Sequence, residues 1–153
     1  MRLIALDPGL KNTGVAIMVD GSIVDTFTLR PNNYSDLMNR VYVLLREVDP
    51  HHVVVEGTIH NSRNPESHLQ AHAIICTALQ TLKILYTELV PSAWKKETVG
   101  KGNATKKEVA AWVKKLYGKI IQHECDALCM ALAWKVIDDR EKEEQKENEE
   151  QKE

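Results

Sequence analysis

Leu3-Ile4-Ala5-Leu6-Asp7-Pro8-Gly9 is the stretch that decides the fold we expect, because it has the character of a buried strand that ends in a carboxylate. An unpaired charge at the end of a buried strand is costly, and a metal ion is its usual partner. Asp-Pro-Gly is also a good turn sequence in its own right. Taken alone, Asp7 fits a simple turn as well as it fits a metal site.

The bulk properties are those of one globular domain. The chain has 153 residues, of which 43% are hydrophobic and 27% are charged. No apolar run approaches the roughly 18 residues that span a bilayer, and the N-terminus lacks the features of a signal peptide. We therefore expect a cytoplasmic protein without a membrane partner. An odd number of cysteines, three, within apolar patterns predicts buried, reduced thiols rather than disulfides.

Charge is distributed unevenly along the chain. Residues 138–153 carry nine acidic and four basic side chains, a net charge of −5, so residues 1–137 carry +3 within the overall −2. The basic excess is compatible with a polyanionic partner. We expect a domain at 1–137 and a charged C-terminal tail at 138–153, which is either a solvated helix extension or disordered.

The N-terminal segment predicts an antiparallel meander. Strands are expected at 2–7, 15–19 and 23–29, and the Asp20-Gly21 pair between the last two is a strong hairpin signal. This arrangement leaves Asp7 at the end of the first strand.

A second strand that ends in a carboxylate follows a predicted helix. Asn33 or Ser35 can cap that helix, which ends before Asp49-Pro50, and the β-branched run 52–56 then stops on Glu56. A strand that follows a crossover helix usually lies parallel to an earlier strand. We therefore expect Glu56 at the same edge of the sheet as Asp7.

The remaining elements complete an α/β fold with a mixed sheet. They are a helix from Pro65 to about Lys83, a short strand at 84–86, a brief helical turn opened by Pro91-Ser92, a helix capped by Thr105 with Glu108, and a last helix from near His123 through Val136.

The last predicted helix supplies further candidate ligands. His123 and Asp126 are three residues apart and therefore share a face near the helix start. With Asp7 and Glu56 they would form a set of three carboxylates and an imidazole. Oxygen-rich sets suit Mg²⁺ or Mn²⁺, and two such ions about 4 Å apart would serve phosphodiester hydrolysis. The constellation indicates nuclease chemistry.

The same residues carry a family resemblance over residues 1 to about 136. The chain resembles the RuvC family of Holliday-junction resolvases in five motifs: Leu6-Asp7-Pro8-Gly9, Gly14-Val15-Ala16, Val54-Val55-Glu56, the run from Val99 to Lys106, and Asp126-Ala127-Leu128. The resemblance implies a ribonuclease H-like fold, with a mixed five-stranded sheet and helices on both faces. It also implies a homodimer that makes paired nicks in branched DNA with two Mg²⁺ per active site, for which Mn²⁺ substitutes, and a possible branch-migration helicase partner.

Site residues follow from the resemblance position by position. Asp7, Glu56 and Asp126 match the catalytic acids of the family. His123 falls where many members have an aspartate and some have a histidine. Whether His123 binds the second metal or orients water is open at this point.

The resemblance also predicts a DNA-binding surface. Lys95 and Lys106 match lysines that contact the DNA backbone near the active site. Ile59 stands where the family often has an aromatic wedge, and an aliphatic side chain there cannot stack on a base. Arg63 and Lys101 are further candidates for the same surface.

Other functions and sites are compatible with parts of this sequence. An RNA-processing nuclease of the same fold is the main alternative function. His68 and His72 have the spacing of a zinc protease motif without its glutamate, so ordinary core or surface histidines are the better account. Cys125 and Cys129 do not share a helical face with His123, which argues against a zinc site. The expected dimer helix, residues 66–83, has an apolar face that could equally belong to the core.

Overall fold

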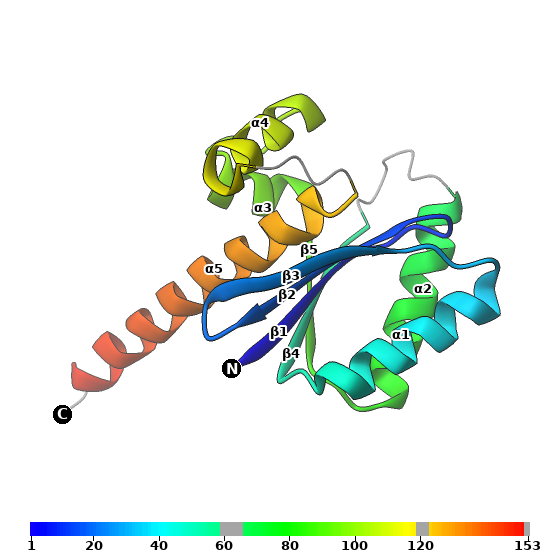
Figure 1. Ribbon diagram of the computed structural model, residues 1–153. Coiled ribbons are helices and arrows are strands. Elements are labelled where there is room, and N and C mark those ends of the chain that lie inside the picture. The colour runs from blue at the N-terminus through cyan, green and yellow to red at the C-terminus, as the bar shows by residue number, and fades with distance from the viewer. Residues whose placement is uncertain (59–65, 119–122, 152–153) are drawn as a thin grey trace.

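The computed structural model describes residues 1–58, 66–118 and 123–151. Among these residues the strands form one mixed sheet in the order β3-β2-β1-β4-β5 (Figure 1). The first three strands pair antiparallel and β4 is parallel to β1, as the sequence predicted. Strand β5 in turn is parallel to β4. Their bounds are β1 Arg2–Asp7, β2 Thr13–Val19, β3 Ser22–Leu29, β4 His52–Glu56 and β5 Tyr86–Leu89.

Helices cover both faces of the sheet, which confirms the predicted architecture (Figure 1). One face packs against α1 and α2, and the other packs against α3, α4 and α5. No helix in the described part of the chain is both long and apolar enough to cross a membrane. The bounds are α1 Tyr34–Val48, α2 Glu66–Thr81, α3 Pro91–Thr98, α4 Lys106–Tyr117 and α5 Cys125–Glu150.

Strand β1 is buried on both sides because it lies at the centre of the sheet. Leu3 and Ala5 belong to the core beneath α5, whereas Ile4 and Leu6 belong to the core beneath α1 and α2. All four side chains are fully buried, and each large one contributes about 1.5–3 kcal/mol of transfer free energy. The end of β1 is therefore a rigid place from which to present Asp7.

Helix starts follow the predicted capping signals. The Asn33 side chain accepts a hydrogen bond from the Asp36 backbone N–H at 2.8 Å, which makes Asn33 the N-cap of α1. At α4, Thr105 and Glu108 form the predicted capping box, and Gly118 ends the helix in a left-handed conformation.

Strand β5 is shifted from its predicted position at 84–86 and runs over Tyr86–Leu89 instead. Ile84 instead closes the turn that follows α2, because its backbone N–H donates to the Leu79 carbonyl at 2.9 Å. Lys83 adopts a left-handed conformation that turns the chain out of the helix. Pairing with β4 consequently begins only at Tyr86.

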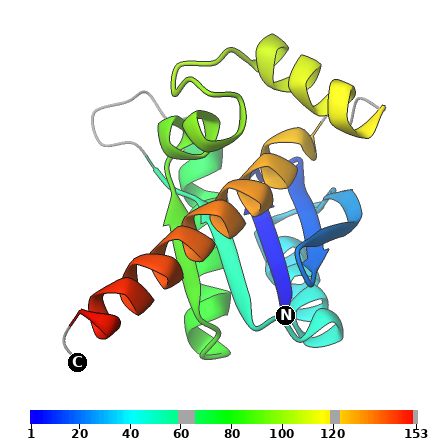
Figure 2. The same cartoon turned by 90° about the vertical axis from the view of Figure 1, so that its left-hand side faces the viewer.

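Helix α5 lies across the sheet and then projects beyond it (Figure 2). Its residues after 138 continue as helix to Glu150, and most of them are exposed. Arg140 reaches back to α3, where it pairs with Glu97 at 2.8 Å. The three cysteines are buried thiols without disulfides, as predicted, and they lie in α2 and α5.

Gly14 allows the chain before α5 to approach the sheet closely. It pairs with Asp7 across β1 and β2. A Cβ atom at this position would lie 2.0 Å from the His123 carbonyl oxygen and 3.5 Å from the Asp7 Cβ. Only glycine leaves room here, so this residue sets the distance between the end of β1 and the start of α5.

Replacing Gly14 with alanine is expected to destabilise the fold by about 1–3 kcal/mol, the usual cost of overpacking. The matched control is Gly57→Ala, because a Cβ there would have its nearest neighbours at an ordinary 3.5 Å. Urea denaturation of both variants measures the difference. Equal stabilities for the two variants would contradict the proposed close approach.

Candidate active site

Strand register brings Asp7 and Glu56 together. The parallel pair β1–β4 sets Leu6 opposite Val55, so the next residues, Asp7 and Glu56, lie side by side. By strand alternation both point to the face covered by α5. Their carboxylate oxygens lie within 4.8 Å of each other, as the sequence predicted for two acids at one edge.

The loop after Asp7 is fixed by a buried hydroxyl. Thr13 is fully buried, and its Oγ1 donates to the Gly9 carbonyl at 2.7 Å. The Gly9 backbone N–H lies 3.3 Å from the same oxygen and donates to it. These two bonds close the loop between β1 and β2. Asp7 therefore lies between a buried strand and a hydrogen-bonded loop, which together fix its position.

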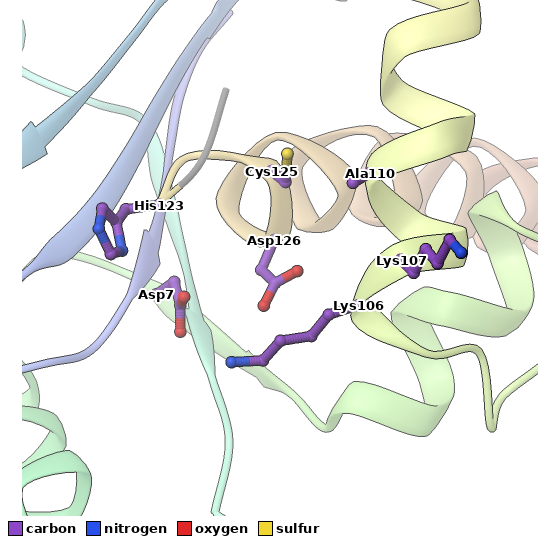
Figure 3. A pocket seen from close by; sticks show the side chains of 7 residues that line it. All are labelled: Asp7, Lys106, Lys107, Ala110, His123, Cys125 and Asp126. Atoms are coloured by element: carbon purple, nitrogen blue, oxygen red, sulfur yellow. The ribbon is translucent and has the colours of Figure 1, made fainter. Parts of the chain in front are cut away.

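Helix α5 adds the third acid at its first turn. Asp126 lines a pocket of about 390 Å³ that also includes Asp7, Lys106 and His123. Figure 3 shows the Asp126 carboxylate and the Lys106 ammonium directed into the same space as Asp7. His123 is exposed at the turn before α5. The structure thus gathers the four predicted site residues at one location.

Burial and mutual repulsion both raise the pKa values of the aspartates in this cluster. Burial raises the pKa of Asp7 well above its usual value, and the charges of Glu56 and Asp126 raise it further. The pKa of Asp126 is also raised, first by burial and then by Glu56. Lys106 acts in the opposite direction on both aspartates. A turn does not require an aspartate beside two other acids. A divalent cation bound there would offset their repulsion.

Trp94 is a site residue that sequence reasoning missed. Its side chain is fully buried in the core. Its Nε1–H also donates to Glu56 Oε1 at 3.1 Å, which orients that carboxylate. A buried indole needs an acceptor for its N–H, but nothing in the sequence identifies Glu56 as the acceptor.

His68 is a second residue that was missed, because it was taken for an ordinary histidine. One of its ring nitrogens lies within 4.8 Å of the carboxylates of Asp7 and Glu56. Nδ1 is 2.9 Å from the Pro8 carbonyl, which can only accept, so Nδ1 carries the proton. In the neutral ring Nε2 then has a free lone pair, which suits it to bind a metal ion.

Two of the five predicted DNA-binding residues, Lys106 and Lys95, lie beside the acids. Lys106 lines the pocket, and the positive charge of Lys95 lowers the pKa of Asp126. Lys101 instead pairs with Glu108, the residue that closes the capping box of α4. Ile59 and Arg63 lie outside the described residues.

A mixed sheet in this strand order, with acids clustered beside its central strand, places the chain among the ribonuclease H-like proteins. Residues 3–134 match the family model described as crossover junction endodeoxyribonuclease RuvC. The chain belongs to the RuvC family.

Relatives and solved structures agree with this assignment. The RuvC of Protochlamydia amoebophila is 32% identical over 148 residues, which cover 85% of this chain and 88% of that protein. The RuvC of Orientia tsutsugamushi is 29% identical over 150 residues, covering 86% and 92%. The structure of Thermus thermophilus RuvC in complex with a Holliday junction substrate superimposes with a TM-score of 0.72 at 23% identity, covering 87% of this chain and 92% of that one.

Replacing Trp94 with phenylalanine keeps the ring but removes the hydrogen bond to Glu56. We expect a loss of about 1–3 kcal/mol in the free energy of unfolding, because the buried acceptor loses its partner. Trp112→Phe on α4 is the matched control, since Trp112 is only partly buried against the same core. Denaturant unfolding compares the two, and equal losses would argue against a specific role of the indole N–H.

Proposed function

We propose that this protein is a metal-dependent endonuclease that resolves Holliday junctions and other branched DNA by paired nicks. The proposal rests on one observation above all, the convergence of Asp7, Glu56 and Asp126 at a pocket where burial and mutual repulsion raise the pKa of both aspartates. Family membership and the junction complex of the Thermus thermophilus protein support the choice of substrate. The RNA-processing alternative has no corresponding support.

The donor set fits Mg²⁺, with Mn²⁺ as a substitute. Carboxylates are the ligands that Mg²⁺ prefers, and three of them here lie close enough to repel one another. Asp7 is the central member, since the charges of both other acids act on it. Asp7, Glu56 and Asp126 would hold two Mg²⁺, and Asp7 would contribute most because both other acids act on it. When bound, the ions supply an activated water and stabilise the leaving oxygen.

The residues around the acids have separate tasks. Trp94 holds Glu56 in place, and the Thr13 hydroxyl fixes the loop that follows Asp7. His68 and His123 offer imidazole nitrogens on the two sides of the cluster, one near Glu56 and one at the turn before α5. We assign His123 to the second metal, either as a ligand or through water.

Lysines would bind the DNA backbone beside the acids. Lys106 enters the pocket and offsets the negative charge of a phosphate placed there. Lys95 lies close enough to act on Asp126 and has its ammonium 5.4 Å from the centre of the Trp94 ring. Lys101, Ile59 and Arg63 stay predictions for the wider DNA surface.

A homodimer would place two such sites on one junction. Helix α2 is the proposed interface, although Ala71, Ile75 and Leu79 on it are already fully buried within the monomer. The face left for a partner includes the exposed residues Leu69 and Ala73. Sedimentation of the purified protein tests this assignment. A branch-migration helicase is a further proposed partner.

Asp7→Asn is expected to reduce nicking of a four-way junction in Mg²⁺ by ~100-fold or more, the scale of losing one preorganised electrostatic group. The measurement is a nicking assay against linear duplex and structured RNA as control substrates. Cleavage at the wild-type rate would contradict the assignment of the site. Equal cleavage of linear duplex would contradict the junction preference but not the nuclease.

The same variant has an expected effect on stability without metal. Because the pKa of Asp7 is raised in the folded state, the folded protein binds this proton more readily than the unfolded chain does. The contribution of Asp7 to the free energy of unfolding should therefore rise as the pH falls from neutral toward the ordinary value of 3.8, whereas acids with a lowered pKa, such as Glu108, act in the opposite direction. In Asp7→Asn the gain from acids with a raised pKa should be smaller, because only Asp126 still contributes to it. Thermal unfolding in chelator at several pH values measures the gain.

Lys106→Gln is expected to slow junction cleavage by ~10-fold or more and to weaken its dependence on salt, because one phosphate contact is lost. Lys115→Gln, on the last turn of the same helix, is the matched control and should cleave normally. Rates at two salt concentrations provide the comparison. If both variants behave alike, Lys106 does not serve the reaction from the pocket.

A further inference from the structure

A second group of potential ligands lies where α2 meets β5. It consists of His72 and Cys76 on α2 and Glu88 on β5. His72 Nε2 is 3.2 Å from Glu88 Oε1 and 3.6 Å from Cys76 Sγ. Cys76 Sγ is 3.6 Å from the same Glu88 oxygen. Three different donor atoms therefore form a closed triangle.

The dimensions of this triangle are those of a zinc site. Zinc binds Cys sulfur at about 2.3 Å and His nitrogen or carboxylate oxygen at about 2.0–2.2 Å, which at tetrahedral angles separates two ligands by about 3.3–3.6 Å. The two separations to Cys76 Sγ, both 3.6 Å, fall in this range, and the separation of 3.2 Å between His72 and Glu88 is about 0.1 Å shorter, so the three atoms are close to one face of such a tetrahedron.

The local structure holds the three ligand groups in place and leaves the site accessible to an ion from solvent. His72 and Cys76 are four residues apart on α2 and so lie on one face of the helix. Cys76 is buried, and the His72 side chain is only 15% exposed, whereas that of Glu88 is 42% exposed. An ion can therefore enter past Glu88, and water can occupy the fourth position.

We propose that His72, Cys76 and Glu88 form a Zn²⁺ site that fixes α2 against β5. A thiolate and an imidazole favour zinc over Mg²⁺, so this site differs in kind from the carboxylate cluster. His68 lies one helical turn earlier, and its ring stacks on that of His72 with 6.5 Å between centroids. A zinc ion at this site would thus fix the turn of α2 on which His68 lies, next to Asp7 and Glu56.

Binding requires loss of the thiol proton. In the metal-free protein Cys76 Sγ donates to Glu88, and burial together with the Glu88 charge raises the pKa of Cys76 to about 11. A zinc-bound thiol is deprotonated outright, because the ion carries the larger local charge. One proton leaves to solvent when the Zn–S bond forms, and no oxidant or reductant is needed.

Cobalt provides the test, because thiolate ligation of Co²⁺ gives an intense near-ultraviolet charge-transfer band that carboxylates cannot produce. The full chain is stripped with chelator and titrated with Co²⁺. We expect the band to saturate at an equimolar ratio of Co²⁺ to chain, to vanish when Zn²⁺ is added, and to withstand excess Mg²⁺. Zn²⁺ should also raise the thermal unfolding temperature of the chelator-treated protein.

Variants separate this site from other ligands. Cys76→Ser should lose the band, and His72→Gln should need more Co²⁺ to reach it. Cys129→Ala should keep it, because Cys129 lies on α5, in the core on the other face of the sheet. Asp7→Asn should keep the band while losing cleavage, so failure of the nuclease proposal would leave this one standing. Absence of the band in folded wild-type protein, or its survival in Cys76→Ser, would overturn the proposal and leave a hydrogen-bonded triad.

Discussion

The gathering of three partly buried carboxylates at one place is the constraint on which the rest of this structure depends. Asp7, Glu56 and Asp126 come from two strands and a helix. The charges of Glu56 and Asp126 raise the pKa of Asp7, and the charge of Glu56 raises the pKa of Asp126. Bringing them together costs free energy that the acids themselves cannot return without a cation. The surrounding fold supplies that free energy through the two cores on either side of β1.

Topology explains why the acids meet at all. Parallel pairing of β1 with β4 sets two strand ends side by side, and α5 starts directly above them because Gly14 admits the chain at His123. The Trp94 indole N–H then holds the Glu56 carboxylate by a hydrogen bond. Rigid strand ends position a site more precisely than loops would, which is what a reaction at a defined phosphate requires.

Local signals predicted most of the fold, while the site was predicted only in part. The Asp20-Gly21 hairpin, the Asn33 cap and the Thr105–Glu108 capping box are decided by residues close in sequence, and the structure shows all of them. Contacts between distant residues left no such signal. The hydrogen bond from Trp94 to Glu56 spans 38 residues, and that from His68 to Pro8 spans 60. Strand β5 was misplaced because an apolar run such as 84–86 fits the end of a helix as well as a strand.

Helix α2 connects two donor sets of different chemistry. His68 faces hard carboxylate oxygens, whereas His72 and Cys76, on the same stripe of the helix, present nitrogen and sulfur. Zinc binds most mixed sites more tightly than Mg²⁺ does, so a carboxylate cluster with a histidine beside it is open to occupation by the wrong ion. A thiolate site one turn away binds zinc in preference to that cluster, because sulfur is the softer ligand. The proposed zinc site would therefore stabilise the position of α2 while leaving the carboxylate cluster to the divalent cation proposed for it.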